Sequence, residues 1–188
     1  MSELRSVPCE DDIELGPLSE EVLTDLAPLA EHKDIVLNCS GGALLIGSDT
    51  LLYRLVFNLV ENAIRYSRPG STVNVSICDN DSHVFLRVED QGPGIPKQYR
   101  ESIFQPFFRL DKSRSRAYGG AGLGLALVWE IAALHGGTVE VEASSKNGTT
   151  MLATLPKRTA ASTEQQNERG PAHVCAGPLF VNAIRPKE

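Results

Sequence analysis

Apolar and polar residues follow regular periods along most of the chain, and these periods predict its elements. Apolar residues recur every three or four positions in three segments, which predicts amphipathic helices over about 18–31, 50–66 and 122–134. Alternation predicts strands at about 35–38, 43–46, 72–77, 84–88, 138–142 and 150–155, and a short helix is expected near 97–103. The order of these elements predicts an α/β fold, a two-layer sandwich with helices on one face of a mixed sheet.

The pattern changes at both ends of the chain. Residues 1–12 are mixed and acidic and form a lead-in, whereas periodic apolar positions define one domain over 13–157. Residues 158–188 form a C-terminal tail in which the stretch 159–171 has Ala and Pro as its only apolar residues, so we expect the tail to be flexible. A few larger apolar residues in 174–184 would allow its last part to dock.

Composition and charge narrow the functional classes. The chain has 188 residues, of which 41% are hydrophobic, and a net charge of −6, which disfavours nucleic-acid binding. No apolar run approaches the ~18 residues of a membrane span, and the N-terminus lacks the features of a signal peptide. These features predict a cytoplasmic domain that makes no membrane contact itself. The cysteines are scattered, and we expect them to be reduced: Cys9, Cys39, Cys78 and Cys175.

The long helix predicted over 50–66 carries a line of polar side chains beside its apolar stripe. At about 100° per residue, Asn58, Asn62 and Arg65 lie within one narrow sector. An amide oxygen can ligate Mg²⁺ and a guanidinium can bind phosphate, although a solvated helix face would show the same residues. The adjacent stripe is expected to face the core and consists of Leu52, Leu55, Val56, Leu59 and Ala63.

Two glycine-rich segments follow the predicted strands. After the strand at 84–88, Asp90 enters a turn with Gly92 and Gly94, where its carboxylate can accept a hydrogen bond from an exocyclic amine; a plain turn built on Asp and Gly is the alternative. Residues 119–125 open a helix, and the free backbone N–H groups there can bind an anion. A basic cluster just upstream points to a polyphosphate, although a flexible hinge and a solvated basic loop remain alternatives; its members are Arg109, Lys112, Arg114 and Arg116.

Five motifs in this order resemble the catalytic ATP-binding domain of two-component sensor histidine kinases, within the wider superfamily of gyrase, Hsp90, histidine kinases and MutL. Residues 58–67 resemble the N box, 90–95 the G1 box, 104–109 the F box, 120–125 the G2 box and 147–150 the final Gly–Thr box. The resemblance covers about residues 13–157. It implies a Bergerat-type sandwich, with a mixed, mostly antiparallel sheet of about five strands and three main helices on one face.

The resemblance also implies ATP and Mg²⁺ as ligands and assigns their contacts. Asn62 would ligate Mg²⁺ with support from Asn58, Arg65 and Tyr66 would contact phosphates and nucleotide, and Asp90 would accept the adenine amino group. The catalytic set would thus be Asn58, Asn62 and Arg65. Further nucleotide contacts would come from the glycine loops, the basic lid and the last box, namely Gly92, Gly94, Ile95, Arg109, Arg114, Arg116, Gly120, Gly122, Leu123, Gly124, Leu125 and Thr149.

One part of the family pattern is missing. The only histidine before the N box is His32, which lacks the flanking acid, the following Thr-Pro and the helical hairpin of a phosphoacceptor site. The chain therefore resembles an excised catalytic domain, or a natural single-domain relative, and would be monomeric. Its expected partner is the phosphoacceptor (dimerisation) domain of a parent kinase, and indirectly a response regulator. The alternatives are an anti-sigma-factor-type serine kinase of the same fold and a nucleotide-sensing module without transfer activity.

Overall fold

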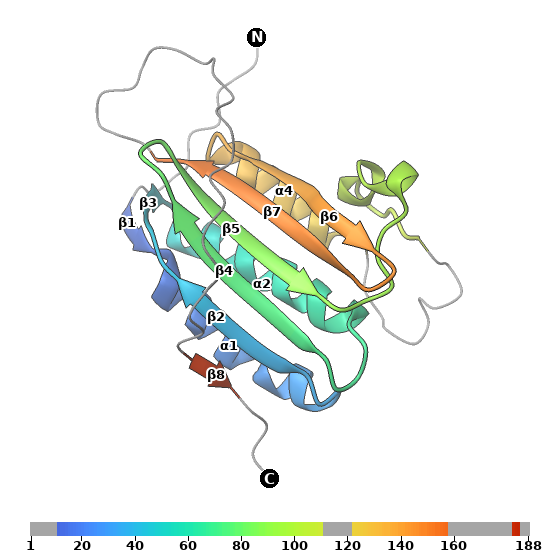
Figure 1. Cartoon of the computed structure of the whole chain (residues 1–188). Coiled ribbons are helices and arrows are strands. Elements are labelled where there is room, and N and C mark those ends of the chain that lie inside the picture. Colours follow the sequence, from blue (N-terminus) through green and yellow to red (C-terminus); the bar gives the residue numbers. More distant parts are fainter. Residues whose placement is uncertain (1–10, 111–121, 158–181, 185–188) are drawn as a thin grey trace.

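The computed structural model describes residues 11–110, 122–157 and 182–184, which form two layers (Figure 1). Three helices, α1 (Leu15–Glu31), α2 (Asp49–Tyr66) and α4 (Gly124–Leu134), lie behind one face of a mixed sheet. The sheet has the order β6-β7-β5-β4-β2-β8, in which only the β2–β4 pair is parallel. Its strands are β2 (Val36–Gly41), β4 (Thr72–Asp79), β5 (His83–Asp90), β6 (Thr138–Ser145), β7 (Gly148–Pro156) and β8 (Asn182–Ile184). The predicted α/β sandwich is confirmed, with five main strands and the short β8 at one edge.

Alternating residues of the strands and one stripe of each helix form the core between the layers. In β5 the inward residues Val84, Leu86 and Val88 are buried, whereas the residues between them face away from the helices. The stripe predicted on α2 is also confirmed, because Leu52, Leu55, Val56, Leu59 and Ala63 are all buried. This packing fixes the rotation of α2 about its axis, and so places its line of polar side chains at the edge of the interface.

Three local elements differ from the prediction. β1 (Asp11–Glu14) pairs with β3 (Leu44–Gly47) in a separate two-stranded sheet, and α1 begins three residues earlier than expected. In β1 only Ile13 is buried, so the strand has no alternation long enough to recognise. The expected short helix consists instead of two 3₁₀ turns, η1 (Lys97–Tyr99) and η2 (Ser102–Phe104). Seven residues are too few to form a stable α-helical segment without strong tertiary support.

The cysteines and the membrane prediction can be compared with the described residues. Cys39 is a free, buried thiol, as expected, and burial raises its pKa to about 11. Cys78 is disulfide-bonded, so the prediction that all cysteines are reduced is wrong for Cys78. The scattered spacing of the cysteines carries no information on which thiols meet in space. None of the helices in the described ranges is long and apolar enough to cross a membrane.

Candidate functional site

Asp90 is the last residue of β5 and organises one end of the candidate site. Its side chain follows the inward-facing Val88 by two positions, so it lies on the helix side of the sheet. Its Oδ1 accepts hydrogen bonds from the backbone N–H groups of Gly92 (2.7 Å) and Thr149 (3.2 Å). Burial raises the pKa of Asp90 above its ordinary value, while these two hydrogen bonds act in the opposite direction. The carboxylate is therefore partly desolvated, with Oδ2 free of hydrogen bonds within the described residues.

The loop after β5 packs against the β6–β7 hairpin, and this contact explains its glycines. Gly94 has a φ of +80°, and a Cβ at this position would lie 2.0 Å from the backbone oxygen of Ser145. A Cβ on Gly92 would lie 2.7 Å from the backbone oxygen of Tyr66. In the structure, protein backbone therefore already occupies the space beside both glycines. They hold the loop close to its neighbours and so shape the site indirectly.

Ser144 joins the three segments that surround Asp90. Its Oγ accepts the backbone N–H of Ile95 (2.7 Å) and lies 3.0 Å from Oγ1 of Thr149. Its backbone oxygen accepts Nη2 of Arg100 (2.9 Å). Ile95 itself is half-buried and packs on the core. Thr149 and Ile95, both predicted site residues, are thus brought to the Asp90 end by a serine that no motif had indicated.

The polar line on α2 runs along the edge of the helix layer. Asn58 donates from Nδ2 to the backbone oxygen of Arg54 (2.6 Å), and the half-buried amide of Asn62 makes no hydrogen bond within the described chain. Arg65 pairs with Glu61 at 2.8 Å, one turn away on the same helix. The Asn62 amide thus has its oxygen available for a ligand, whereas Arg65 would have to exchange a carboxylate partner for phosphate.

The two ends of this line reach the two glycine-rich loops. At the C-terminal end of α2, the N–H of Gln91 lies 3.3 Å from Oγ of Ser67, next to Asp90. At Asn58, Oδ1 lies beside Gly124 at the start of α4, 3.0 Å from where a Cβ would be. Eight residues of helix from Asn58 to Tyr66 correspond to about 12 Å. The arrangement therefore offers a carboxylate at one end, a helix N-terminus at the other, and amides and a guanidinium between them.

The predicted lid is described only at its two ends, which meet. The N–H of Phe107 donates to the backbone oxygen of Gly122 (2.9 Å), and Phe107 adopts a positive φ of 64° with an exposed side chain. Arg109 is exposed, Leu123 is exposed, and Leu125 packs on the core. The remaining predicted lid and G2 residues, Arg114, Arg116 and Gly120, lie outside the described residues, as does the cation Lys112.

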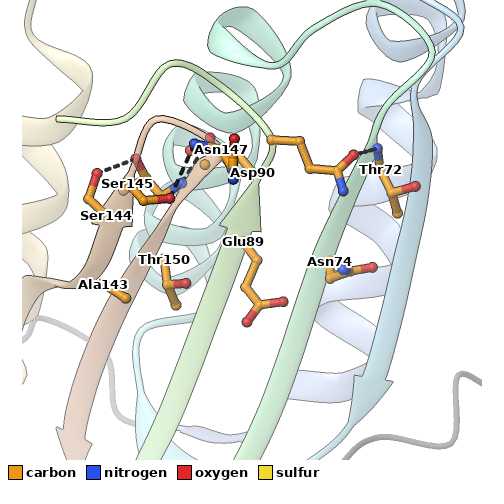
Figure 2. Close-up of a pocket in the computed structure, with 12 residues that line it drawn as sticks. Thr72, Asn74, Glu89, Asp90, Ala143, Ser144, Ser145, Asn147 and Thr150 are labelled. Atoms are coloured by element: carbon orange, nitrogen blue, oxygen red, sulfur yellow. Dashed lines mark hydrogen bonds between the residues drawn. The ribbon is translucent and has the colours of Figure 1, made fainter.

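A polar groove of about 390 Å³ lies on the open face of the sheet (Figure 2). Its lining includes Asn74, Glu89 and Thr150, whose side chains project from the strands on the side away from the helices. Glu89 and Asp90 are consecutive strand residues, so their side chains point to opposite faces of β5. Asp90 forms part of the rim of this groove, but its carboxylate belongs to the helix side, where the predicted site residues gather.

Lys33 is a further residue that supports the site. Its Nζ donates to the backbone oxygens of Ile64 (3.0 Å), Arg65 (2.6 Å) and Ser67 (3.1 Å), the last carbonyl groups of α2. A cation at a helix C-terminus also interacts favourably with the helix dipole. The acceptors are backbone atoms more than 30 residues away, so no pattern of residue types could have identified this contact.

Comparisons with known proteins agree with this geometry. Residues 47–159 match the family model described as histidine kinase-, DNA gyrase B- and HSP90-like ATPase. The sensor-like histidine kinase SenX3 of Mycobacterium tuberculosis is 38% identical over 152 residues, which are 80% of this chain and 37% of SenX3. The solved mycobacterial sensor histidine kinase MprB has a TM-score of 0.68 and 30% identity, over 79% of this chain and 98% of MprB. Full-length ShkA in complex with AMPPNP has a TM-score of 0.71 and 26% identity, over 81% of this chain and 32% of ShkA.

The chain belongs to the histidine kinase-, DNA gyrase B- and HSP90-like ATPase family. Within that family it corresponds to the ATP-binding catalytic domain of a sensor histidine kinase. It spans little more than a third of the length of the first curated relatives, at 37% of SenX3.

Proposed function

We propose that the domain binds Mg·ATP along α2, between the Asp90 loop and the start of α4. We further propose that the longer protein transfers the γ-phosphoryl group to a histidine of a separate phosphoacceptor domain. The observation that carries the proposal is that Asp90 and Gly124 adjoin opposite ends of one line of polar side chains on α2. A nucleotide lying along this line would meet complementary groups at both of its ends.

The base would bind at Asp90. Oδ1 already accepts two backbone N–H groups, which leaves Oδ2 to accept a hydrogen bond from the exocyclic amine of adenine. A base with a carbonyl at that position would leave the half-buried carboxylate facing another acceptor, which is costly. Thr149 and Ile95 would line this end, because Ser144 holds both of them against Asp90.

The phosphates and Mg²⁺ would bind at the Asn58 end. α4 begins at Gly124, and its N-cap Leu123 makes no side-chain capping hydrogen bond, so its first backbone N–H groups can bind phosphate. The amide of Asn62, which has no hydrogen bond in the described chain, fits an oxygen ligand of Mg²⁺, the chemistry that hard cations prefer. The metal would neutralise phosphate charge, while Asn58 and Arg65 would orient the phosphates.

The acceptor would be a histidine presented by another part of the longer protein, which would pass the phosphoryl group to a response regulator in the cytoplasm. The exposed apolar side chains of Phe107, Leu123 and Trp129 support a protein contact near the start of α4, since they are 72%, 44% and 53% exposed. SenX3 and MprB are both named as histidine kinases, which favours histidine over serine as the acceptor.

The test is transfer in trans. The chain is incubated with γ-labelled Mg·ATP and a separately made phosphoacceptor domain from the same parent, with a serine-bearing substrate of anti-sigma-factor kinases as control. We expect acid-labile label on the acceptor domain only. Acid-stable label on the serine substrate, or no label with either one, would contradict the proposed transfer; ATP binding measured by calorimetry tests the nucleotide site separately.

A further inference from the structure

His135 follows the last residue of α4 and is only 3% exposed. Its Nδ1 lies 2.8 Å from the backbone oxygen of Ile131, and its Nε2 lies 3.3 Å from the backbone nitrogen of Ser48. A carbonyl oxygen can only accept a hydrogen bond and a backbone N–H can only donate one. Nδ1 therefore carries the proton and Nε2 carries the lone pair, so the partners select one tautomer of the neutral imidazole.

The junction between β3 and α2 is shaped around this ring. A Cβ on Gly47 would lie 2.8 Å from both Cδ2 and Nε2 of His135, so a larger residue at position 47 would displace the imidazole. Ser48 is the N-cap of α2 but makes no side-chain capping hydrogen bond; its backbone N–H is bound by His135 instead. The imidazole thus joins the end of α4 to the beginning of α2.

The same two helices also meet at the other end of α4, where Gly124 lies against the side chain of Asn58. Ser48 and Asn58 are ten positions apart, and Gly124 and His135 are eleven positions apart, which correspond to about 15 and 16.5 Å of helix. The helices are therefore antiparallel neighbours, fixed to each other at two points with nearly equal spacing. His135 supplies the point that is remote from the nucleotide.

We propose that His135 is a positioning residue for the phosphate end of the nucleotide site. This inference rests on the proposed function, because it concerns how α4 is held relative to α2 when Mg·ATP binds between them. The start of α4 provides N–H groups for phosphate and α2 provides Asn58 and Asn62, so the His135–Ser48 contact sets the distance between the two sets of groups. The base end is built on β5 and β7 and does not depend on it.

A loss of this contact would therefore affect the two ends of a nucleotide differently. If α4 moves relative to α2, the phosphates and Mg²⁺ lose ideal geometry, and displacements of about 1 Å have large effects at such sites. Adenosine contacts only the Asp90 end, which is fixed by the hydrogen bonds of Gly92 and Thr149. The ratio of the affinities for Mg·ATP and adenosine therefore distinguishes a positioning role of His135 from a general loss of stability.

The experiment compares Mg·ATP and adenosine by calorimetry, well below the Tm of each variant. His135→Phe keeps a ring but removes both hydrogen bonds. It should lower the affinity for Mg·ATP about tenfold, which is the lower end of the range for partners that orient metal ligands. Its affinity for adenosine should stay within about twofold of the wild-type value. His135→Gln, whose amide oxygen can reach the Ser48 N–H, should restore Mg·ATP affinity to within about threefold of the wild type. His32→Gln, at an exposed site, is the matched control and should change neither affinity.

Equal losses for both ligands, or no loss in His135→Phe, would overturn the inference. If His135→Phe fails to fold, Gly47→Ala provides the same test, since its Cβ would push the ring from Ser48 while both ring nitrogens remain. Nitrogen chemical shifts of the wild-type imidazole should show the Nδ1–H tautomer, and the Nε2–H tautomer would contradict the geometry. Wild-type protein that does not bind Mg·ATP would refute the proposed function itself, which is a distinguishable outcome.

Discussion

The backbone N–H of Thr149 donates a hydrogen bond of 3.2 Å to Oδ1 of Asp90, although 59 positions separate the two residues. The same oxygen also accepts the N–H of Gly92. One carboxylate oxygen thus ties the β6–β7 hairpin and the loop after β5 to the end of β5, while the other remains for the base. Asp90 therefore has a structural role and a proposed binding role, each on its own oxygen.

Asp90→Asn should separate these roles. Its amide oxygen can still accept both backbone N–H groups, but its NH₂ would face the amine of adenine, so two donors would meet. We expect a folded protein in which ATP affinity falls about 30- to 150-fold, which corresponds to the cost of ~2–3 kcal/mol for an unsatisfied buried polar group. Calorimetry measures this directly. Glu89→Gln is the matched control on the opposite face of β5, and equal losses in both variants would contradict the assignment.

The same variant predicts a pH dependence of stability. Burial raises the pKa of Asp90 in the folded protein, so folding favours its protonated form. Below the unfolded pKa of about 3.9, wild type and Asp90→Asn both have a neutral side chain there. As the pH rises through the folded pKa, the wild type loses the stability that the protonated acid contributed, whereas the variant does not. In urea denaturation, the free energy of unfolding of the variant should therefore rise relative to that of the wild type between acidic and neutral pH. The opposite trend would show that the two hydrogen bonds outweigh burial in setting the pKa of Asp90.

Lys33→Met should destabilise the domain through the end of α2. The substitution keeps most of the apolar stem but leaves the carbonyls of Ile64, Arg65 and Ser67 without their ammonium donor. From the usual contributions of hydrogen bonds to charged groups and of charges at helix ends, we expect the free energy of unfolding to fall by about 1–2 kcal/mol, or the Tm by roughly 3–6 °C. Thermal denaturation measures it, with Lys97→Met at an exposed position as control. A decrease in Tm no larger than that of Lys97→Met would show that water replaces the Lys33 ammonium without loss of stability.

Gly94→Ala and Gly70→Ala form a matched pair at positive φ. Both glycines have similar backbone angles, φ +80° and +72°, but a Cβ on Gly70 would meet nothing within 4 Å. Gly70→Ala should therefore cost about 1–2 kcal/mol, the conformational penalty alone. At Gly94 the Cβ would overlap the backbone oxygen of Ser145, so the loop must also leave the hairpin, and we expect a larger loss of stability together with weaker ATP binding. Equal unfolding free energies in urea would contradict the packing explanation.

The features that could be predicted from the sequence are those in which the type and spacing of the residues indicate where their side chains lie. The buried stripe on α2 could be predicted because apolar residues recur there with the period of a helix that packs on a core. Its residues are Leu52, Leu55, Val56, Leu59 and Ala63. Asp90 was indicated because a carboxylate at a strand end enters a turn with two glycines. The positions of the candidate site residues on α2 and β5 therefore followed from local sequence.

The parts that were missed depend on contacts with backbone atoms. His135 binds the N–H of Ser48 and Lys33 binds three carbonyls of α2, and any residue can supply such a partner, so no spacing indicates the contact. The β1–β3 ribbon was missed for another reason, since a four-residue strand with one buried position has no detectable period. The three phenylalanines of the F box lie in different environments that the motif does not distinguish: Phe107 is exposed, whereas Phe104 and Phe108 pack on the core.

The isolated chain should bind Mg·ATP without phosphorylating itself on histidine. His32 follows α1 and precedes Lys33, whose ammonium binds carbonyls at the C-terminal end of α2. The proposed phosphate end lies near Asn58, nine residues before Ser67, or about 13 Å along the helix. Phosphoryl transfer requires in-line approach at about 3–3.5 Å. Incubation of the chain alone with γ-labelled ATP should therefore give no acid-labile label, and acid-labile label that disappears in His32→Gln would show that the end of α1 reaches the γ-phosphate.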